Sequence, residues 1–266
     1  MSRRVAIGGL GPIGSKLARA LDEGIPGFAL SAVATRNVAK AEALLSSLTS
    51  RPPVVPIDAL EGYADVVIEC APAALLPAII APFLRAGKTA IVMSVGALLE
   101  REDLMDLARA NAGQIIVPSG ALLGLDAVTA AAQGTIHSVR MITRKPVRGL
   151  AGAPYLSAQN ICLDNIREPL KIFEGSARQA AQGFPANLNV AAALSLAGIG
   201  PDRTIVEIWA DPTLSRNIHR IEVDADSASF SMSIANVPSE NPRTGRITAL
   251  SVIAYLRKVY APLRVG

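Results

Sequence analysis

The chain has 266 residues, of which 50% are hydrophobic but only 4% aromatic, and its net charge is +4. This length allows one large domain or two smaller ones, with a core built from Ala, Val, Leu and Ile. The basic residues are scattered, so a nucleic-acid partner is not indicated. Cys70 and Cys162 lack the spacing of a disulfide framework or a metal site, which favours a reducing cytoplasm and gives no sign of a bound metal.

The opening residues give no sign of a secretory leader, because the apolar run after Arg4 is soon interrupted by glycines. The longest apolar stretch, Cys70 to Leu84, carries three prolines and is too short to span a bilayer. We therefore expect a soluble protein with no membrane partner.

In the first half of the chain, short β-branched runs alternate with Ala-rich helical stretches. The predicted strands are 5–7, 29–34, 66–70, 89–94 and 114–117, and the predicted helices are 16–22, 39–48, 75–86 and 102–110. Such alternation is typical of an α/β fold with a doubly wound parallel sheet of the Rossmann type.

The pattern changes after about Pro118. Residues 121–132 are predicted to form a helix, and polar and apolar residues alternate in the later strands 204–210, 218–223 and 229–234. We expect a dinucleotide-binding domain over 1–119 and an α+β domain over 120–245 for substrate binding and dimerisation. A helix within 246–266 is expected to pack back on the first domain.

A glycine turn joins the first predicted strand to the first helix. Gly9, Gly11 and Gly14 form the pattern G-x-G-x-x-G in the strand–turn–helix context that gives it meaning. The first glycine permits the tight turn, the second lets the backbone approach a pyrophosphate, and the third lets helix and strand pack closely. We expect a nicotinamide dinucleotide here, with Pro12 and Ile13 completing the turn.

The second predicted strand ends without the acidic residue that usually binds the ribose 2′-hydroxyl of NAD. It leads instead into Thr35, Arg36 and Asn37. Arg36 has the chemistry to pair with a 2′-phosphate or to stack on adenine, although it also suits a solvated strand end. The cofactor is therefore expected to be NAD or NADP, with NADP tolerated at least.

From Ala71 onward the chain carries motifs more specific than the glycine turn. They are Ser94–Leu98, Pro118–Ala121, Arg144–Pro146, Phe184–Val190, Gly198–Thr204, Ala210–Pro212, Asn217–His219 and Asn236–Pro242. In this order they resemble the L-aspartate dehydrogenase family over essentially the whole chain. The resemblance implies NAD(P)-dependent oxidation of L-aspartate to iminosuccinate, which hydrolyses to oxaloacetate and ammonia or passes to NAD biosynthesis. It also suggests a homodimer.

The resemblance places the catalytic histidine of the family at His219. We hypothesise that it activates water for attack on the imine and moves a proton, or else orients a substrate carboxylate. The family's cofactor contacts fall on Asn189 and on Leu123, where relatives commonly have Ala. Ala71 is also expected at the cofactor. Either Asn187 or Asn189 alternatively suits the cap of an Ala-rich helix.

Two substrate carboxylates require cations or aligned donors. The candidates are Arg144, Lys145 and Arg243. We expect Lys145 first and Arg243 second, in loops over a cleft, with Asn217 beside the histidine. The only other histidine, His137, is expected at the entry of a strand and is taken as structural.

Two alternatives remain open from the sequence. The same fold serves other NAD(P) oxidoreductases acting on small amino or dicarboxylic acids, including homoserine dehydrogenases and dihydrodipicolinate reductases, but their own lysine and histidine motifs are not found here. A non-catalytic NAD(P)-binding sensor is the second alternative.

Overall fold

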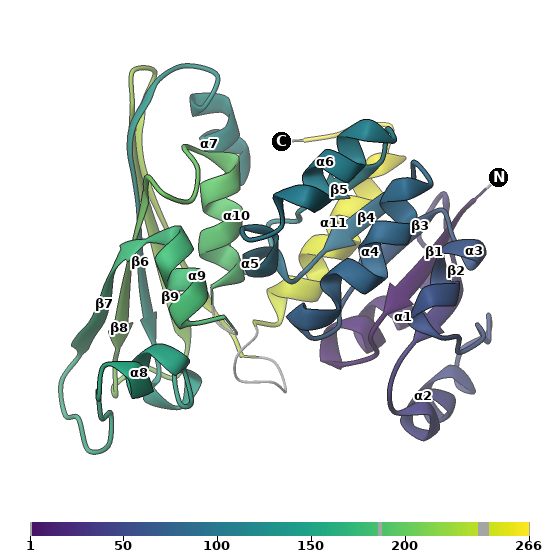
Figure 1. The fold of residues 1–266 in the computed structure, drawn as a ribbon, viewed down its shortest axis with the longest axis horizontal. Coiled ribbons are helices and arrows are strands. Elements are labelled where there is room, and N and C mark those ends of the chain that lie inside the picture. The colour runs from purple at the N-terminus through teal and green to yellow at the C-terminus, as the bar shows by residue number, and fades with distance from the viewer. Residues whose placement is uncertain (1, 186–187, 239–244, 266) are drawn as a thin grey trace. The chain divides into compact units, whose positions relative to one another are not determined.

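The computed structural model describes residues 2–185, 188–238 and 245–265 (Figure 1). The chain separates into two compact units, one formed by residues 1–120 with 248–266 and the other by residues 121–247. Arg243 lies outside the described residues.

The first unit contains a five-stranded parallel sheet. Its strands are β1 (Arg3–Gly8), β2 (Phe28–Ala34), β3 (Val66–Glu69), β4 (Thr89–Val92) and β5 (Gln114–Ile116), in the order β2-β1-β3-β4-β5. Outside β2, Val54 makes a single parallel bridge to Val33. The strand order reverses between β1 and β3, and a ligand crevice is expected at the carboxyl ends of strands at such a point. The predicted Rossmann-type sheet is confirmed.

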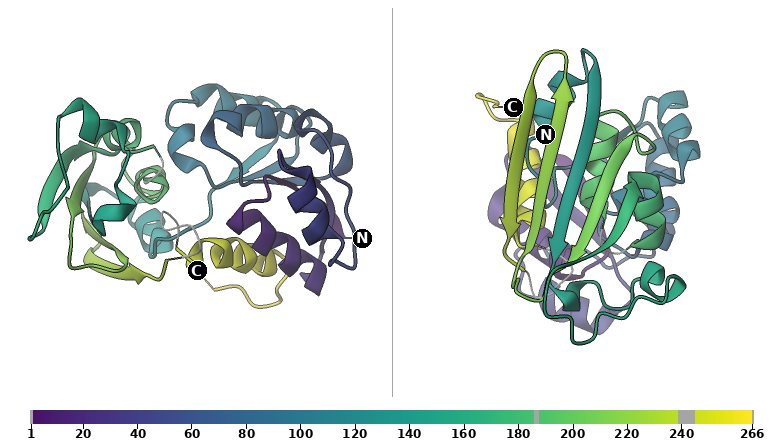
Figure 2. Two further views of the ribbon diagram at one scale, coloured as in Figure 1. Left: turned by 90° about the horizontal axis from the view of Figure 1, so that it is seen from below. Right: turned by 90° about the vertical axis from the view of Figure 1, so that its left-hand side faces the viewer.

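Helices cover both faces of this sheet (Figure 2, left). They are α1 (Pro12–Gly24), α2 (Val38–Leu45), α3 (Leu60–Tyr63), α4 (Leu76–Arg85), α5 (Val95–Leu98), α6 (Glu102–Ala110) and α11 (Ile247–Val259). Val252 and Leu256 of α11 are fully buried in the same apolar cluster as Val5 of β1 and Leu17 of α1. The C-terminal helix is thus part of the core of the first unit.

The second unit contains a mixed five-stranded sheet. Its strands are β6 (Ile136–Lys145), β7 (Leu170–Ser176), β8 (Thr204–Ala210), β9 (Asn217–Ala225) and β10 (Ser229–Asn236), in the order β10-β9-β6-β8-β7. Only β6 and β8 are parallel to each other. The predicted α+β character of this half is confirmed.

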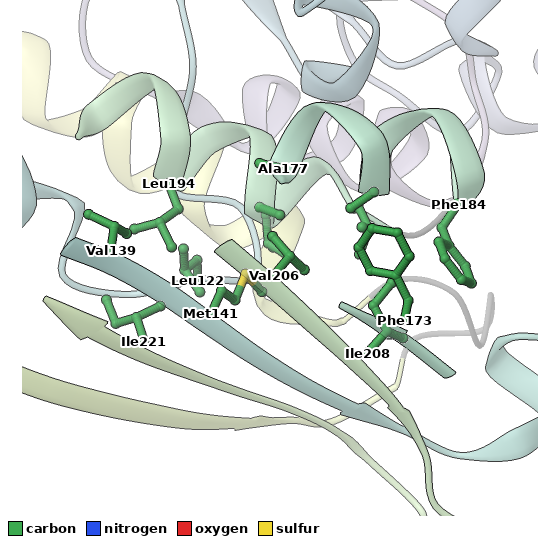
Figure 3. Close-up of a cluster of buried hydrophobic side chains, with 14 of the residues drawn as sticks. Leu122, Val139, Met141, Phe173, Ala177, Phe184, Leu194, Val206, Ile208 and Ile221 are labelled. Atoms are coloured by element: carbon green, nitrogen blue, oxygen red, sulfur yellow. The ribbon is translucent and has the colours of Figure 1, made fainter. Parts of the chain in front are cut away.

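Helices cover one face of the mixed sheet (Figure 2, right). They are α7 (Leu125–Ala131), α8 (Pro154–Ala158), α9 (Ala177–Gly183) and α10 (Asn189–Ala197). Alternation in β9 puts Ile221 and Val223 on the covered face and the charged Arg220 and Glu222 on the other. Side chains of sheet and helices interlock between the layers, as Figure 3 shows for Val139, Met141, Leu194, Val206 and Ile221, among others.

Two local predictions for this half were inaccurate. The helix predicted over 121–132 begins only at Leu125, because Gly124 at its N-cap has a left-handed backbone with φ of +67°. Strand β7 was not predicted, and of β6 only its start around His137 was expected to be a strand. A capping box starts α9, where Ser176 and Gln179 each bond the backbone of the other.

In the described part of the chain, every helix is too short or too polar to cross a bilayer.

Candidate functional site

The glycine turn after β1 has no room for side chains at two of its three glycines. Gly9 has φ of +110°, and a Cβ added there would lie 2.7 Å from the carbonyl oxygen of Cys70. A Cβ on Gly14 would lie 1.9 Å from the carbonyl oxygen of Gly9, so only glycine lets α1 pack this closely. A Cβ on Gly11 would meet no atom within 4 Å, which leaves open space on that side of the turn.

The start of α1 is suited to an anion. Gly11 is the N-cap and provides no side-chain cap, and Pro12 at the first position has no N–H. The remaining backbone N–H groups of the first turn, together with the positive end of the helix dipole, favour a phosphate group. The open space at Gly11 and the uncapped helix start fit the pyrophosphate of a dinucleotide.

Glu69 joins the loops that follow β3 and β4. Its carboxylate is fully buried and accepts hydrogen bonds from Ala71 N (3.0 Å), Ser94 N (2.9 Å), Ser94 Oγ (3.0 Å) and Met93 N (3.2 Å). Burial raises the pKa of Glu69, and these donors oppose that rise. In a Rossmann crevice the β2 side holds the adenosine half, so these loops border the nicotinamide half. Ala71, predicted at the cofactor, lies in this group, whereas Glu69 itself was not predicted.

Arg36 follows the end of β2 with an exposed side chain. The neighbouring turn is closed by a hydrogen bond from Asn37 N to Thr35 Oγ1 at 3.3 Å. Arg36 therefore lies just beyond the carboxyl end of β2 with its side chain in solvent.

In the second unit, the covered face of the mixed sheet changes from apolar to polar toward one end. Along β6 the covered residues run from Val139 and Met141 to Thr143 and Lys145. Along the antiparallel β9 the polar end carries Asn217 and His219, followed by apolar residues. Asn236 occupies the same end of β10. We call Thr143, Lys145, Asn217, His219 and Asn236 the polar cluster.

Strand register brings the members of the polar cluster together. Thr143 is directly opposite His219, and Asn217 is directly opposite Asn236. Directly opposed residues have Cβ atoms about 4.5–5.5 Å apart on the same face. All five side chains are buried, with His219 and Lys145 each only 2% exposed. Because buried polar groups are costly, their concentration at one place marks a candidate ligand site.

His219 is held by one contact at its ring. Its Nδ1 is 2.7 Å from Thr143 Oγ1, which leaves Nε2 as the ring nitrogen available to a ligand. Burial, and to a smaller extent the positive charge of Lys145, together lower the pKa of His219 to about 3. The imidazole is therefore neutral at neutral pH and able to accept a proton or a hydrogen bond.

Lys145 and Arg144 point to opposite faces of β6, as alternation along a strand requires. Burial lowers the pKa of Lys145 to about 8, so the amine still carries a proton at neutral pH. Arg144 lies 5.3 Å from the ring centre of Trp209 and 3.7 Å from the Asp211 carboxylate. The expectation that both lie in loops is wrong: they end a strand, and Arg144 is outside the polar cluster.

The other predicted residues lie in different places. Leu123 is partly buried against the core of the second unit, in the segment just before α7. Asn189 is the first residue of α10 and therefore not its N-cap, which is Leu188; the other predicted cap, Asn187, lies outside the described residues. His137 lies exposed on β6. Thr143 and Asn236 were not predicted as site residues.

The packing around Gly11 and Gly14 predicts that an added methyl group has different effects at the two positions. Gly11→Ala should leave the melting temperature unchanged, because the backbone at φ −72° and ψ −170° accepts Ala, yet weaken dinucleotide binding about tenfold or more. Gly14→Ala should lower both the melting temperature and the affinity for the dinucleotide. Thermal unfolding and fluorescence titration with reduced dinucleotide measure the two effects, with Gly62→Ala as the control in open space. Full affinity in Gly11→Ala would contradict the assignment.

Burial of neutral His219 predicts acid sensitivity of the second unit. The unfolded imidazole gains a proton below its ordinary pKa of 6.5, whereas the folded one resists protonation down to about 3. Stability is therefore lost as the pH falls through 6.5, by about 2 kcal/mol at pH 5. His219→Gln should lack this loss, while exposed His137→Gln should keep it. Urea unfolding followed by the fluorescence of Trp209, the only tryptophan, measures this loss. The same dependence of unfolding free energy on pH in the wild type and both variants would contradict the prediction.

Comparison with known proteins agrees with both halves of this description. Residues 126–259 match the profile "Aspartate dehydrogenase, C-terminal", and residues 9–118 match "Homoserine dehydrogenase, NAD binding domain". The first unit is therefore a pyridine-nucleotide-binding domain. The L-aspartate dehydrogenase of Bradyrhizobium diazoefficiens is 66% identical over 99% of this chain and 94% of that protein.

L-aspartate dehydrogenase 3 of Bordetella bronchiseptica is 57% identical over 98% of this chain and 97% of its own length. The crystal structure of aspartate dehydrogenase from Thermotoga maritima has the same fold, with a TM-score of 0.75 over 100% of both chains at 23% identity. Together with the match of its second half, these identities show that the chain belongs to the L-aspartate dehydrogenase family of oxidoreductases.

Proposed function

We propose that this enzyme oxidises L-aspartate to iminosuccinate with NAD or NADP, and that iminosuccinate then hydrolyses to oxaloacetate and ammonia. The observation that supports this most directly is the polar cluster, which combines a buried neutral imidazole with a buried ammonium group. Relatives at 66% and 57% identity carry the name L-aspartate dehydrogenase. The homoserine-dehydrogenase alternative rests only on the nucleotide-binding half, which several oxidoreductase families share.

The substrate brings two carboxylates, and the polar cluster supplies donors for them. Lys145 provides a cation with its pKa near 8, protonated at neutral pH. Asn217 adds an amide two residues from His219 on the same face of β9. In a buried setting such charge-assisted contacts are stronger than at the surface.

His219 is the proposed catalytic residue. Hydride loss from Cα of the neutral amine leaves an iminium ion, and water must then add to its carbon while giving up a proton. The Nε2 atom of neutral His219 is suited to accept that proton, while Thr143 holds the opposite ring nitrogen. The carboxylates of a bound substrate raise the pKa of His219 from its low value toward neutrality and so make it a better base. Its alternative role is to orient a carboxylate.

The pyridine nucleotide, when bound, accepts the hydride. In the first unit, the glycine turn from Gly9 to Gly14, with Pro12 and Ile13, would hold its pyrophosphate, and Ala71 would border its nicotinamide half. We assign further cofactor contacts to Leu123, through its backbone, and to Asn189. Glu69 keeps the loops after β3 and β4 in one arrangement.

Assembly and location belong to the same proposal. The uncovered face of the mixed sheet exposes Ile205, at 38%, and this supports a homodimer formed through that face. Cys70 and Cys162 are both free thiols, as a cytoplasmic enzyme would carry them.

A substrate panel tests the proposed reaction. L-Aspartate should reduce the nucleotide, whereas D-aspartate, L-glutamate and L-homoserine should be poor substrates; oxaloacetate with ammonia should oxidise it. His219→Ala should lose at least about 100-fold in kcat but keep its affinity for the cofactor. His137→Ala is the control. Absence of turnover with L-aspartate and in reverse would refute the substrate assignment, and normal turnover in His219→Ala would refute the role of His219.

Cofactor choice is tested at the end of β2. Arg36→Asp should lower the ratio of NADP affinity to NAD affinity by about tenfold or more, because it replaces a cation that pairs with the 2′-phosphate by an anion that repels it. Titration of both reduced cofactors gives the ratio, with Arg19→Asp on exposed α1 surface as the charge control. An unchanged ratio would show that Arg36 only ends a solvated strand.

A further inference from the structure

One buried polar atom in the described residues lacks a hydrogen-bond partner. It is the side-chain oxygen Oδ1 of Asn236, whose residue is only 4% exposed. The other end of the same amide is engaged, because Nδ2 donates to the carbonyl oxygen of Ala121 at 2.8 Å. A buried acceptor without a partner costs about 1–3 kcal/mol, so its presence requires an explanation.

The contact with Ala121 fixes which way the amide faces. If the amide were turned over, Oδ1 would face the carbonyl oxygen of Ala121, and two acceptors would oppose each other. Oδ1 is therefore a fixed acceptor, and a ligand at this atom must bring an N–H or O–H donor.

Strand pairing places this acceptor in the polar cluster. Asn236 is directly opposite Asn217, and His219 lies diagonally two residues along β9, opposite Ile234. Diagonal neighbours on one face are about 7–8 Å apart, a span that a four-carbon dicarboxylate can bridge. Gly245 packs against the Asn236 side chain, because a Cβ added there would lie only 3.3 Å from Oδ1.

The polar cluster contains both hydrogen-bond donors and hydrogen-bond acceptors. The Lys145 ammonium and the Asn217 amide suit carboxylates, but Asn236 Oδ1 suits only a donor. L-Aspartate carries one such donor group, its amino nitrogen. We propose that Asn236 Oδ1 accepts a hydrogen bond from the substrate amino group, and from the imine N–H that replaces it. This rests on the proposed function and makes Asn236 the residue that distinguishes an amino acid from a plain dicarboxylate.

Comparison of two ligands in one variant tests the assignment. Asn236→Ala should raise the KM for L-aspartate about tenfold or more, since a buried hydrogen bond to a charged donor is lost. The inhibition constant of succinate, which has the same two carboxylates and no nitrogen, should stay within about twofold of the wild-type value, because Ala removes no contact to succinate. Ser233→Ala, on the exposed face of the same strand, is the matched control.

Other outcomes would overturn the proposal. Equal weakening of aspartate and succinate would mean that Asn236 only supports the strand end, and an unchanged KM for aspartate would remove it from the site. If the variant weakened only cofactor binding, Asn236 Oδ1 would be assigned to the cofactor instead of the substrate. If the Ala variant does not fold, Asn236→Ser undergoes the same comparison. Wild-type turnover of L-aspartate separates a failure of this inference from a failure of the proposed function.

Discussion

The antiparallel pairing of β6 with β9 sets the chemistry of the second unit. It places Thr143 opposite His219 and aligns the polar ends of both strands on the face that the helices cover. A slip of one residue in either strand would turn its buried set toward solvent and expose its apolar residues. The hydrophobic requirement at Val139, Met141, Ile221 and Val223 therefore also fixes the position of the polar residues at the strand ends.

Burial of a cation and a neutral imidazole on this face has a cost, since both the lowered pKa of Lys145 and that of His219 result mainly from loss of solvent. Replacement of both by apolar residues would leave a better core. The same low-polarity setting makes each remaining charge act strongly on a bound ligand. The first unit contains a buried charge of the opposite kind, the carboxylate of Glu69. Its oxygens accept hydrogen bonds from the loops after β3 and β4, so it holds these loops in place.

The sequence predicts the first unit well and the second less completely. Strands β1 to β5 are short, β-branched and separated by helices, so their positions came out within about two residues. Only the start of strand β6 was expected, because Thr143 and Lys145 interrupt its apolar alternation at the end where the polar cluster lies. The proposed site residues Thr143 and Lys145 thus obscure the strand pattern of β6 in the sequence.

Candidate site residues divide in a similar way. His219 and Asn217 stood out through family motifs, whereas Thr143 could be found only once strand register was known. Asn236 lies inside a recognised motif, but its unpaired oxygen is a property of three-dimensional packing. A carboxylate inside the apolar run Val66–Glu69 was a visible signal for Glu69, because a charge in a buried strand needs partners.

The return of α11 to the first unit bears on how the chain is made. Val252, Ile253 and Leu256 complete the apolar cluster that includes β1 and α1, but they are synthesised after all of the second unit. The ribosome therefore releases a parallel sheet with one face incompletely covered, and that face closes only when the last helix emerges. The second unit is one continuous segment, so its core does not depend on a helix that is synthesised later. Topology thus makes the nucleotide-binding unit, although first in order, the last to be finished.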